Sequence, residues 1–194
     1  MENLVTKLHS IGAIKFGAFP LKKNFIAPFE VDLSLAISHP EVAKQIATLL
    51  WKKVEVFPHE LLCGVPAIGS CLVTYLAWTH DHPLIMRQEK KESAPQILGH
   101  YKTGQRCLLL GGMAISGASC LDMVDDLTAE GVEVKDILLF LDLQQGAKQK
   151  IKGRGYAPHF LITFSEVAQI LYDREKIGGD TFKLVSDFLE GDKR

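Results

Sequence analysis

Short runs of apolar residues alternate with longer amphipathic segments along this chain. Leu61–Cys63, Pro83–Met86, Cys107–Leu110 and Ile137–Leu141 are apolar throughout, and His159–Phe164 is a fifth, mainly apolar run. Runs this short and uninterrupted are typical of strands that are buried on both faces of a parallel sheet. We therefore expect five strands, each followed by a helix or a loop.

Segments with helical spacing separate these strands. Ser38–Trp51 begins with a Ser-x-x-Glu capping box and carries its apolar residues on one face. Ala67–Trp78 is apolar almost all round, which predicts a buried helix. Ser165–Tyr172 and Asp180–Leu189 are amphipathic and close the chain. This alternation predicts the α/β class, with a central, mainly parallel sheet flanked by helices.

The segment Gly111–Ser119, which reads GGMAISGAS, links a predicted strand to a predicted helix. We expect Gly111 and Gly112 to end the strand and Ser119 to cap the helix. Small residues before a helix can present backbone N–H groups and hydroxyls to a phosphate. Every tight strand-to-helix turn also needs small residues, so a packing role is the alternative. The spacing matches neither a Walker A loop nor a Rossmann fingerprint.

The polar stretch Arg87–Gln105 is the longest connection without clear periodicity. Long connections inside a compact domain are uncommon and are often functional. A plain surface hairpin is the alternative.

Composition narrows the classes of function. The chain has 194 residues, 22 Lys plus Arg and 23 Asp plus Glu, for a net charge of -1, which argues against a general nucleic-acid or membrane-surface binder. No apolar run approaches the roughly 18 residues of a membrane span, and the first residues lack the core of a signal peptide. Four cysteines without metal-site spacing predict free thiols, so we expect a cytoplasmic protein with no metal of its own. The pair His80 and His82 predicts a surface turn, with a metal site as the weaker alternative.

Five segments together resemble a known family. Gly111–Ser119 is similar to the type I phosphoribosyltransferase signature, in which two acidic residues precede a Thr/Ser-Gly phosphate loop. Ile11–Leu33, Cys63–Pro66 (CGVP), Leu84–Glu92 (LIMRQEKKE) and Leu141–Lys148 (LDLQQGAK) resemble orotate phosphoribosyltransferases, especially the amino-terminal domain of eukaryotic UMP synthases. The resemblance implies one domain, residues 1–194, of the type I phosphoribosyltransferase fold. It would comprise a small hood segment (1–35), a core (36–175) and a carboxyl-terminal helix (176–194).

The resemblance also implies a reaction: orotate and phosphoribosyl pyrophosphate (PRPP) give orotidine monophosphate and pyrophosphate, with Mg²⁺ carried by the substrate. Such a reaction needs cations around the leaving pyrophosphate, because charge develops there in the transition state. Carboxylates must hold the ribose hydroxyls, and a cation must hold the orotate carboxylate. The family acts as a homodimer in which a mobile loop of one subunit reaches the other's site.

The resemblance assigns these roles to individual residues. The catalytic cations fall on Lys22, Arg87 and Lys91. The phosphate turn falls on Ile115, Ser116, Gly117, Ala118 and Ser119. The base and sugar pocket falls on Phe29, Gly111, Gly112, Asp142 and Leu143.

Several of these positions depart from the family pattern. Gly111 and Gly112 stand where the family has two acidic residues, Leu143 stands in place of an arginine, and Ile115 replaces a threonine. In the loop, Gln88 stands where the family usually has another lysine, and Ser93 stands where it has histidine or tyrosine. We therefore expect an impaired or altered orotate phosphoribosyltransferase. The alternative is a non-catalytic dimeric member that binds a nucleotide monophosphate or phosphate in a regulatory or scaffolding role.

The helix after the turn offers substitute carboxylates at Asp122, Asp125 and Asp126. Helical spacing places them toward solvent or in capping positions, so we do not expect them to hold the sugar.

Overall fold

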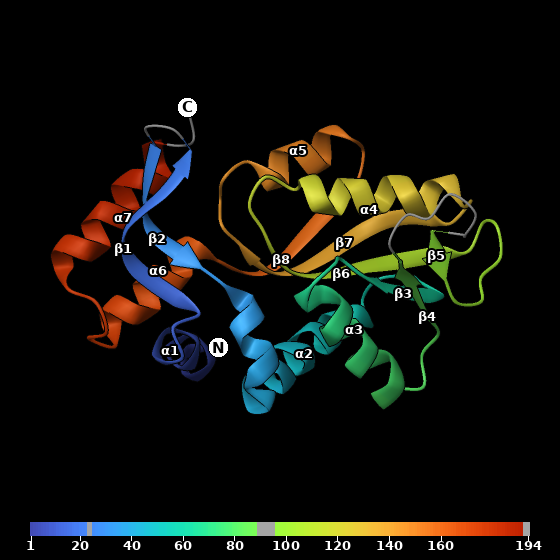
Figure 1. Ribbon diagram of the computed structural model, residues 1–194, viewed down its shortest axis with the longest axis horizontal. Helices are drawn as coiled ribbons and strands as arrows, with labels where there is room; N and C mark the ends of the chain where they lie inside the picture. The colour runs from blue at the N-terminus through green and yellow to red at the C-terminus, as the bar shows by residue number, and fades with distance from the viewer. Residues whose placement is uncertain (23–24, 89–95, 192–194) are drawn as a thin grey trace.

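The computed structural model describes residues 1–22, 25–88 and 96–191, and its centre is a six-stranded sheet in the order β5-β4-β3-β6-β7-β8 (Figure 1). The strands are β3 (Leu61–Gly64), β4 (Leu84–Arg87), β5 (Ile97–Leu98), β6 (Arg106–Ala114), β7 (Glu133–Asp142) and β8 (Ala157–Thr163). Strands β4, β3, β6, β7 and β8 run parallel, and β5 is an antiparallel edge strand. The predicted α/β class with a mainly parallel sheet is confirmed.

Helices cover both faces of this sheet (Figure 1). The first pair is α2 (Pro40–Val54) and α3 (Ile68–Thr79), and the opposite pair is α4 (Ala118–Ala129) and α5 (Ala147–Gly153). Successive strand residues feed the two resulting cores in turn: Leu108 belongs to one buried cluster and Leu109 to the other. This double burial explains why the strands are apolar without interruption.

A second layer lies beside the sheet, at the left of Figure 1. It contains α1 (Glu2–Ser10) and the antiparallel hairpin of β1 (Ile14–Lys22) and β2 (Phe25–Val31), with α6 (Phe164–Asp173) and α7 (Gly179–Gly191) packed against them. The hood segment therefore packs with the two carboxyl-terminal helices.

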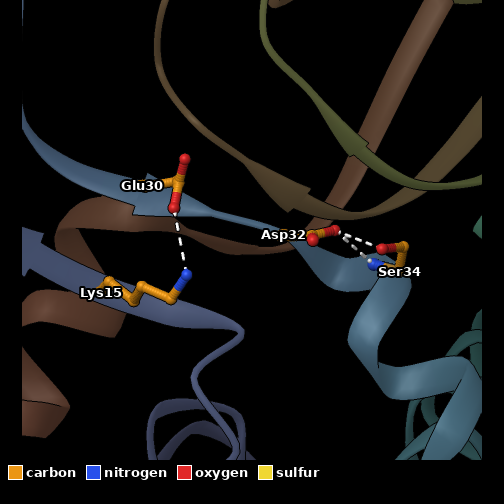
Figure 2. Close-up of polar contacts among 4 residues, drawn as sticks. All are labelled: Lys15, Glu30, Asp32 and Ser34. Atoms are coloured by element: carbon orange, nitrogen blue, oxygen red, sulfur yellow. Dashed lines mark hydrogen bonds and ion pairs between the residues drawn. The ribbon is translucent and has the colours of Figure 1, made fainter. Parts of the chain in front are cut away.

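Two polar contacts shape the hairpin and its exit toward the core (Figure 2). Lys15 and Glu30 face each other across the strands, with 3.3 Å between Lys15 Nζ and Glu30 Oε2. Asp32 Oδ1 accepts hydrogen bonds from the backbone N–H and the hydroxyl of Ser34, at 2.9 Å and 2.6 Å. Asp32 thereby caps the 3-10 helix η1 (Leu33–Ser38), which leads into α2.

The start of α2 differs from the prediction, and the capping box at Ser38 is wrong. Ser38 is the last residue of η1, and α2 begins at Pro40 with His39 as an N-cap that makes no side-chain capping bond. Proline suits the first helical position because its φ is preset and it has no N–H to satisfy. It also disfavours helical backbone at the residue before it, which keeps His39 outside the helix.

Two further predictions around β6 are wrong. Gly111 and Gly112 do not end the strand, because β6 continues to Ala114 and pairs with β7 through Gly111 and Leu139. The N-cap of α4 is Gly117, not Ser119. Gly117 has a φ of 73°, a left-handed conformation that glycine adopts without strain.

Among the described residues, no helix combines the length and the apolar character that a membrane crossing requires.

Candidate functional site: the turn between β6 and α4

The turn from β6 to α4 encloses a cavity of about 220 Å³ lined by Met113–Cys120. Ile115, Ser116 and Ser119 are exposed there, whereas Gly117 is buried under α5. No side chain caps α4, so the N–H groups of its first turn have no partner within the helix. Those N–H groups and the positive end of the helix dipole make the turn suited to an anion such as phosphate.

The two glycines of β6 are covered by apolar side chains. A Cβ built on Gly111 would overlap Leu139 Cδ2, and one built on Gly112 would overlap Ile68 Cγ2. Leu139 and Ile68 thus occupy the space into which side chains at these positions would point. No carboxylate stands at Gly111 or Gly112, so these residues do not fit a hydrated Mg²⁺ ion.

Asp142 ends β7 beside the turn, paired in the sheet with Ala114 on one side and Thr163 on the other. Its carboxylate is buried and its Oδ1 accepts a hydrogen bond from the Gln144 N–H at 2.8 Å. Burial raises the pKa of Asp142, although the Gln144 bond and the charge of Lys148 lower it in part. The cation Lys148 therefore lies within electrostatic reach of this edge of the sheet.

Leu143 and Phe29 lie in the core. Leu143 is 4% exposed and belongs to the same buried cluster as Phe29 and Phe164. Phe29 stacks on Phe164 with 3.8 Å between ring centroids and meets the edge of Phe188 at 5.7 Å. Two aromatic neighbours therefore occupy the surroundings of a ring that the resemblance assigned to the base pocket.

The predicted cations are placed unequally. Arg87 ends β4, and its Nη2 lies 2.7 Å from Oδ2 of Asp126 on α4. Lys22 is the last residue of β1, at the tip of the hairpin. Lys91 lies outside the described residues. Of the three predicted cations, the structure describes a side-chain contact for Arg87.

The carboxylates of α4 are not all toward solvent as predicted. Asp125 is about half exposed and pairs with Arg154 at 2.7 Å, which fits the prediction. Asp126 is 8% exposed, so its predicted solvent-facing position is wrong. The reason is Arg87, whose guanidinium supplies the opposite charge that a buried carboxylate needs.

The predicted surface turn at His80 and His82 packs against aromatic rings. His80 stacks on Trp51 with 3.7 Å between centroids, and His82 stacks on His59 at 4.7 Å. Within residues 1–22, 25–88 and 96–191, no three His, Cys, Asp or Glu side chains are arranged to hold a metal ion.

Sequence reasoning missed three residues that shape this site: Ile68, Leu139 and Asp126. Ile68 and Leu139 lie within apolar segments, where nothing marks them as facing a glycine. The burial of Asp126 could have been suspected from the sequence, because Asp126 lies next to Leu127 and near Val124 in the predicted helix, and both of these apolar residues are buried.

Comparison with known proteins places this arrangement in a class. The chain superposes on Leishmania donovani UMP synthase with a TM-score of 0.89 at 21% identity, covering 98% of this chain and 42% of that one. This likeness identifies the fold as that of the type I phosphoribosyltransferases. No protein-family profile matches the chain.

Sequence relatives then narrow the class. The chain is 34% identical to bovine uridine 5'-monophosphate synthase over 195 residues, which is 98% of this chain but 41% of that protein. It is 30% identical to the orotate phosphoribosyltransferase of Chlamydia caviae, covering 97% of this chain and 94% of that enzyme. The chain therefore belongs to the orotate phosphoribosyltransferase family.

Proposed function

We propose that this protein binds the 5'-phosphate of orotidine monophosphate or PRPP at the turn Ile115–Ser119 and transfers phosphoribose to orotate only weakly. The observation that carries the proposal is a contrast between two neighbouring parts of the carboxyl edge of the sheet. The turn retains a cavity and an uncapped helix end, whereas Leu139 and Ile68 fill the space beside Gly111 and Gly112.

The proposed phosphate binding relies mainly on backbone N–H groups, which remain when side chains are substituted. Backbone N–H groups of Ala118 and Ser119 are available at the helix start, and the hydroxyls of Ser116 and Ser119 are exposed. None of these donors depends on the residues that the chain has lost. A 5'-phosphate is the part of both candidate ligands that needs only such donors.

The impairment half rests on three missing charged groups. The ribose hydroxyls lose two carboxylate partners at Gly111 and Gly112, and the orotate carboxylate loses a cation at Leu143. Losing one oriented polar contact typically slows a reaction about 10²–10³-fold. Asp142 does not compensate, because its charge is buried and its Oδ1 already accepts from Gln144.

Two measurements on the same preparation test the halves separately. We expect the rate of orotidine monophosphate formation from orotate, PRPP and Mg²⁺ to lie at least about 100-fold below that of the Chlamydia caviae enzyme. We also expect orotidine monophosphate, at about 100 times its dissociation constant, to raise the melting temperature by roughly 5–10 °C. A rate equal to that enzyme's contradicts the impairment, and an unchanged melting temperature contradicts the binding.

A strictly non-catalytic role is the second candidate. It is favoured by the burial of Leu143, because an apolar side chain packed in the core cannot supply the cation that the orotate carboxylate needs. Ligand stabilisation with no turnover at high protein concentration identifies this role.

We also propose that the protein forms a homodimer and is located in the cytoplasm. Cys71, Tyr75 and Trp78 form an exposed stripe along α3, and Trp78 is 76% exposed. Burying such a stripe against a second copy would remove apolar surface from water. All four cysteines are free, as is usual in a reducing compartment. Light scattering of the protein and of Trp78→Lys tests the dimer, which should weaken in the variant, and cell fractionation tests the location.

A further inference from the structure

The contact between Arg87 and Asp126 ties a predicted catalytic cation to a helix of its own subunit. Arg87 Nη2 lies 2.7 Å from Asp126 Oδ2, and the side chains are 26% and 10% exposed. A pair this poorly solvated is weakly screened, so it holds the guanidinium more firmly than an exposed pair would. Two backbone contacts fix the same segment: Arg87 pairs with Ile97 in the sheet, and Gln88 N–H donates to the Gln96 carbonyl.

The position of Asp126 along α4 decides what Arg87 can reach. Asp126 follows Ala118, the first residue of α4, by eight residues, which is about 12 Å along the helix axis. A phosphate bound at Ile115–Ser119 would lie at the amino-terminal end of α4, about 12 Å along the helix axis from Asp126. While Arg87 is paired with Asp126, its guanidinium therefore does not contact the 5'-phosphate proposed for the turn of its own subunit. The pyrophosphate of PRPP is attached to the opposite end of the ribose, and it is the group that the resemblance assigns to Arg87.

The two carboxylates next to each other on α4 differ in what they do. Asp125 pairs with Arg154 at the same 2.7 Å, but both side chains are about half exposed. Exposed pairs of that kind contribute little, because solvent competes for both charges. The Asp126 carboxyl group is instead mostly buried, and leaving such a group without its cationic partner is costly, so the pair with Arg87 is held more firmly.

We propose that Asp126 is a positioning residue that withholds Arg87 from the pyrophosphate group of PRPP. This inference rests on the proposed function, because it assumes a phosphoribosyl ligand at the turn. An incoming pyrophosphate must compete with the Asp126 carboxylate for one guanidinium. The competition lowers affinity for PRPP but leaves orotidine monophosphate, which has no pyrophosphate, unaffected.

Calorimetric titration with PRPP and with orotidine monophosphate tests the inference. Asp126→Asn should bind PRPP roughly tenfold more tightly than the native protein, the gain expected from one charge-assisted hydrogen bond. Its affinity for orotidine monophosphate should change less than twofold. Asp125→Asn is the matched control, because it removes the same charge one residue away and should leave PRPP affinity within about twofold. The gain must disappear in Asp126→Asn combined with Arg87→Ala.

A ligand-free measurement separates this inference from the proposed function. The NMR signals of the Arg87 Nη–H groups, assigned by their loss in Arg87→Lys, should exchange with solvent at least several-fold faster in Asp126→Asn and in the apolar variant Asp126→Leu. If the variants bind no phosphorylated ligand but exchange is faster, the proposed function fails and the role of Asp126 in holding Arg87 stands. If exchange is unchanged, or if Asp125→Asn matches Asp126→Asn in PRPP affinity, the inference is overturned.

Discussion

Gly112 and Ile68 meet at the carboxyl edge of the sheet so closely that the Ile68 methyl group occupies the place of a Cβ on Gly112. Gly111 and Leu139 repeat this relationship on the opposite face of β6, where the two residues are also sheet partners. Each glycine thus faces an apolar side chain that fills its missing volume. Close packing of this kind makes the present residues depend on one another.

The packing predicts that Gly112→Ala is destabilising although alanine is small. The added methyl must displace Ile68 Cγ2 in a buried position, and overpacking of this kind costs about 1–3 kcal/mol of unfolding free energy. Gly153→Ala is the control, because a Cβ at this last residue of α5 meets nothing within 4 Å. Urea denaturation of both variants measures the difference, and equal stabilities would show that Ile68 yields freely.

Restoring the family's charged residues should fail without changes in their neighbours. Gly111→Glu with Gly112→Asp places two carboxylates against Leu139 and Ile68, where they are crowded and unsolvated. We expect this double variant to be less stable than Gly112→Ala and to form no orotidine monophosphate.

Shortening the two apolar neighbours provides the counterpart. Adding Leu139→Ala and Ile68→Thr to the double variant should recover stability, because it reopens the space for the carboxylates. Thermal melts and a PRPP-dependent turnover assay on both variants test this prediction. Higher turnover in the uncompensated variant would contradict the account of a filled site.

Gly117→Ala should remove ligand binding as well as some stability. The backbone of Gly117 has a φ of 73°, and a Cβ there would lie 3.0 Å from Ile151 Cγ1. A side chain in that conformation costs roughly 1–2 kcal/mol. Relief of that strain would shift the turn and its N–H groups, so orotidine monophosphate should no longer raise the melting temperature.

Gly155→Ala separates the two effects of the Gly117 change. Gly155 also has a left-handed φ, 87°, but nothing lies within 4 Å of its Cβ position. The variant should lose comparable backbone stability and keep its thermal response to the ligand. A full response in Gly117→Ala would exclude the turn as the phosphate site.

The sequence predicted the elements better than the site, for physical reasons that particular residues show. Leu108 and Leu109 belong to opposite cores. Because both faces of the strands are buried, successive strand residues are apolar, and these apolar runs are visible in the sequence. The start of α2 was misplaced because a capping-box pattern does not by itself fix where a helix begins. Ser38 and Thr163 are both followed three residues later by Glu, but of these two only Thr163 forms a capping box, with Glu166. The filling of the site was not predictable, because the contact of Gly111 with Leu139 depends on the register between β6 and β7.

Asp142→Asn should stabilise the protein at neutral pH and not at low pH. Burial raises the pKa of Asp142, so the folded state holds its proton more tightly than the unfolded state does. Its favourable contribution is complete below the unfolded pKa and is lost as pH rises through the folded pKa. Asparagine is neutral throughout and can still accept from the Gln144 N–H. Urea denaturation at pH 7.5 and pH 3.5 should show a gain in unfolding free energy only at the higher pH.

His82, which stacks on His59, should make the fold less stable in mild acid. His59 Nδ1 lies 2.7 Å from the Phe57 carbonyl, an acceptor, so this nitrogen carries the ring proton and donates it. Among the described residues, Nε2 of His59 is buried with no hydrogen-bond partner. Burial, and also the nearby His59, lower the pKa of His82, against a smaller raising effect of its bond to the Pro83 carbonyl.

A lowered histidine pKa means that the unfolded chain takes up the proton first as pH falls. The contribution of His82 to the unfolding free energy should therefore be constant above about pH 7.5 and decrease as pH drops below the ordinary histidine value near 6.5. His82→Asn should flatten this decrease between pH 7.5 and pH 5.5, measured by urea denaturation at several pH values. His100→Asn is the control, because it removes an exposed imidazole outside the stack and should leave the slope as it is. An unchanged slope in His82→Asn would assign the acid sensitivity to other groups, first of all to His9, whose pKa is lowered by burial and by Lys176.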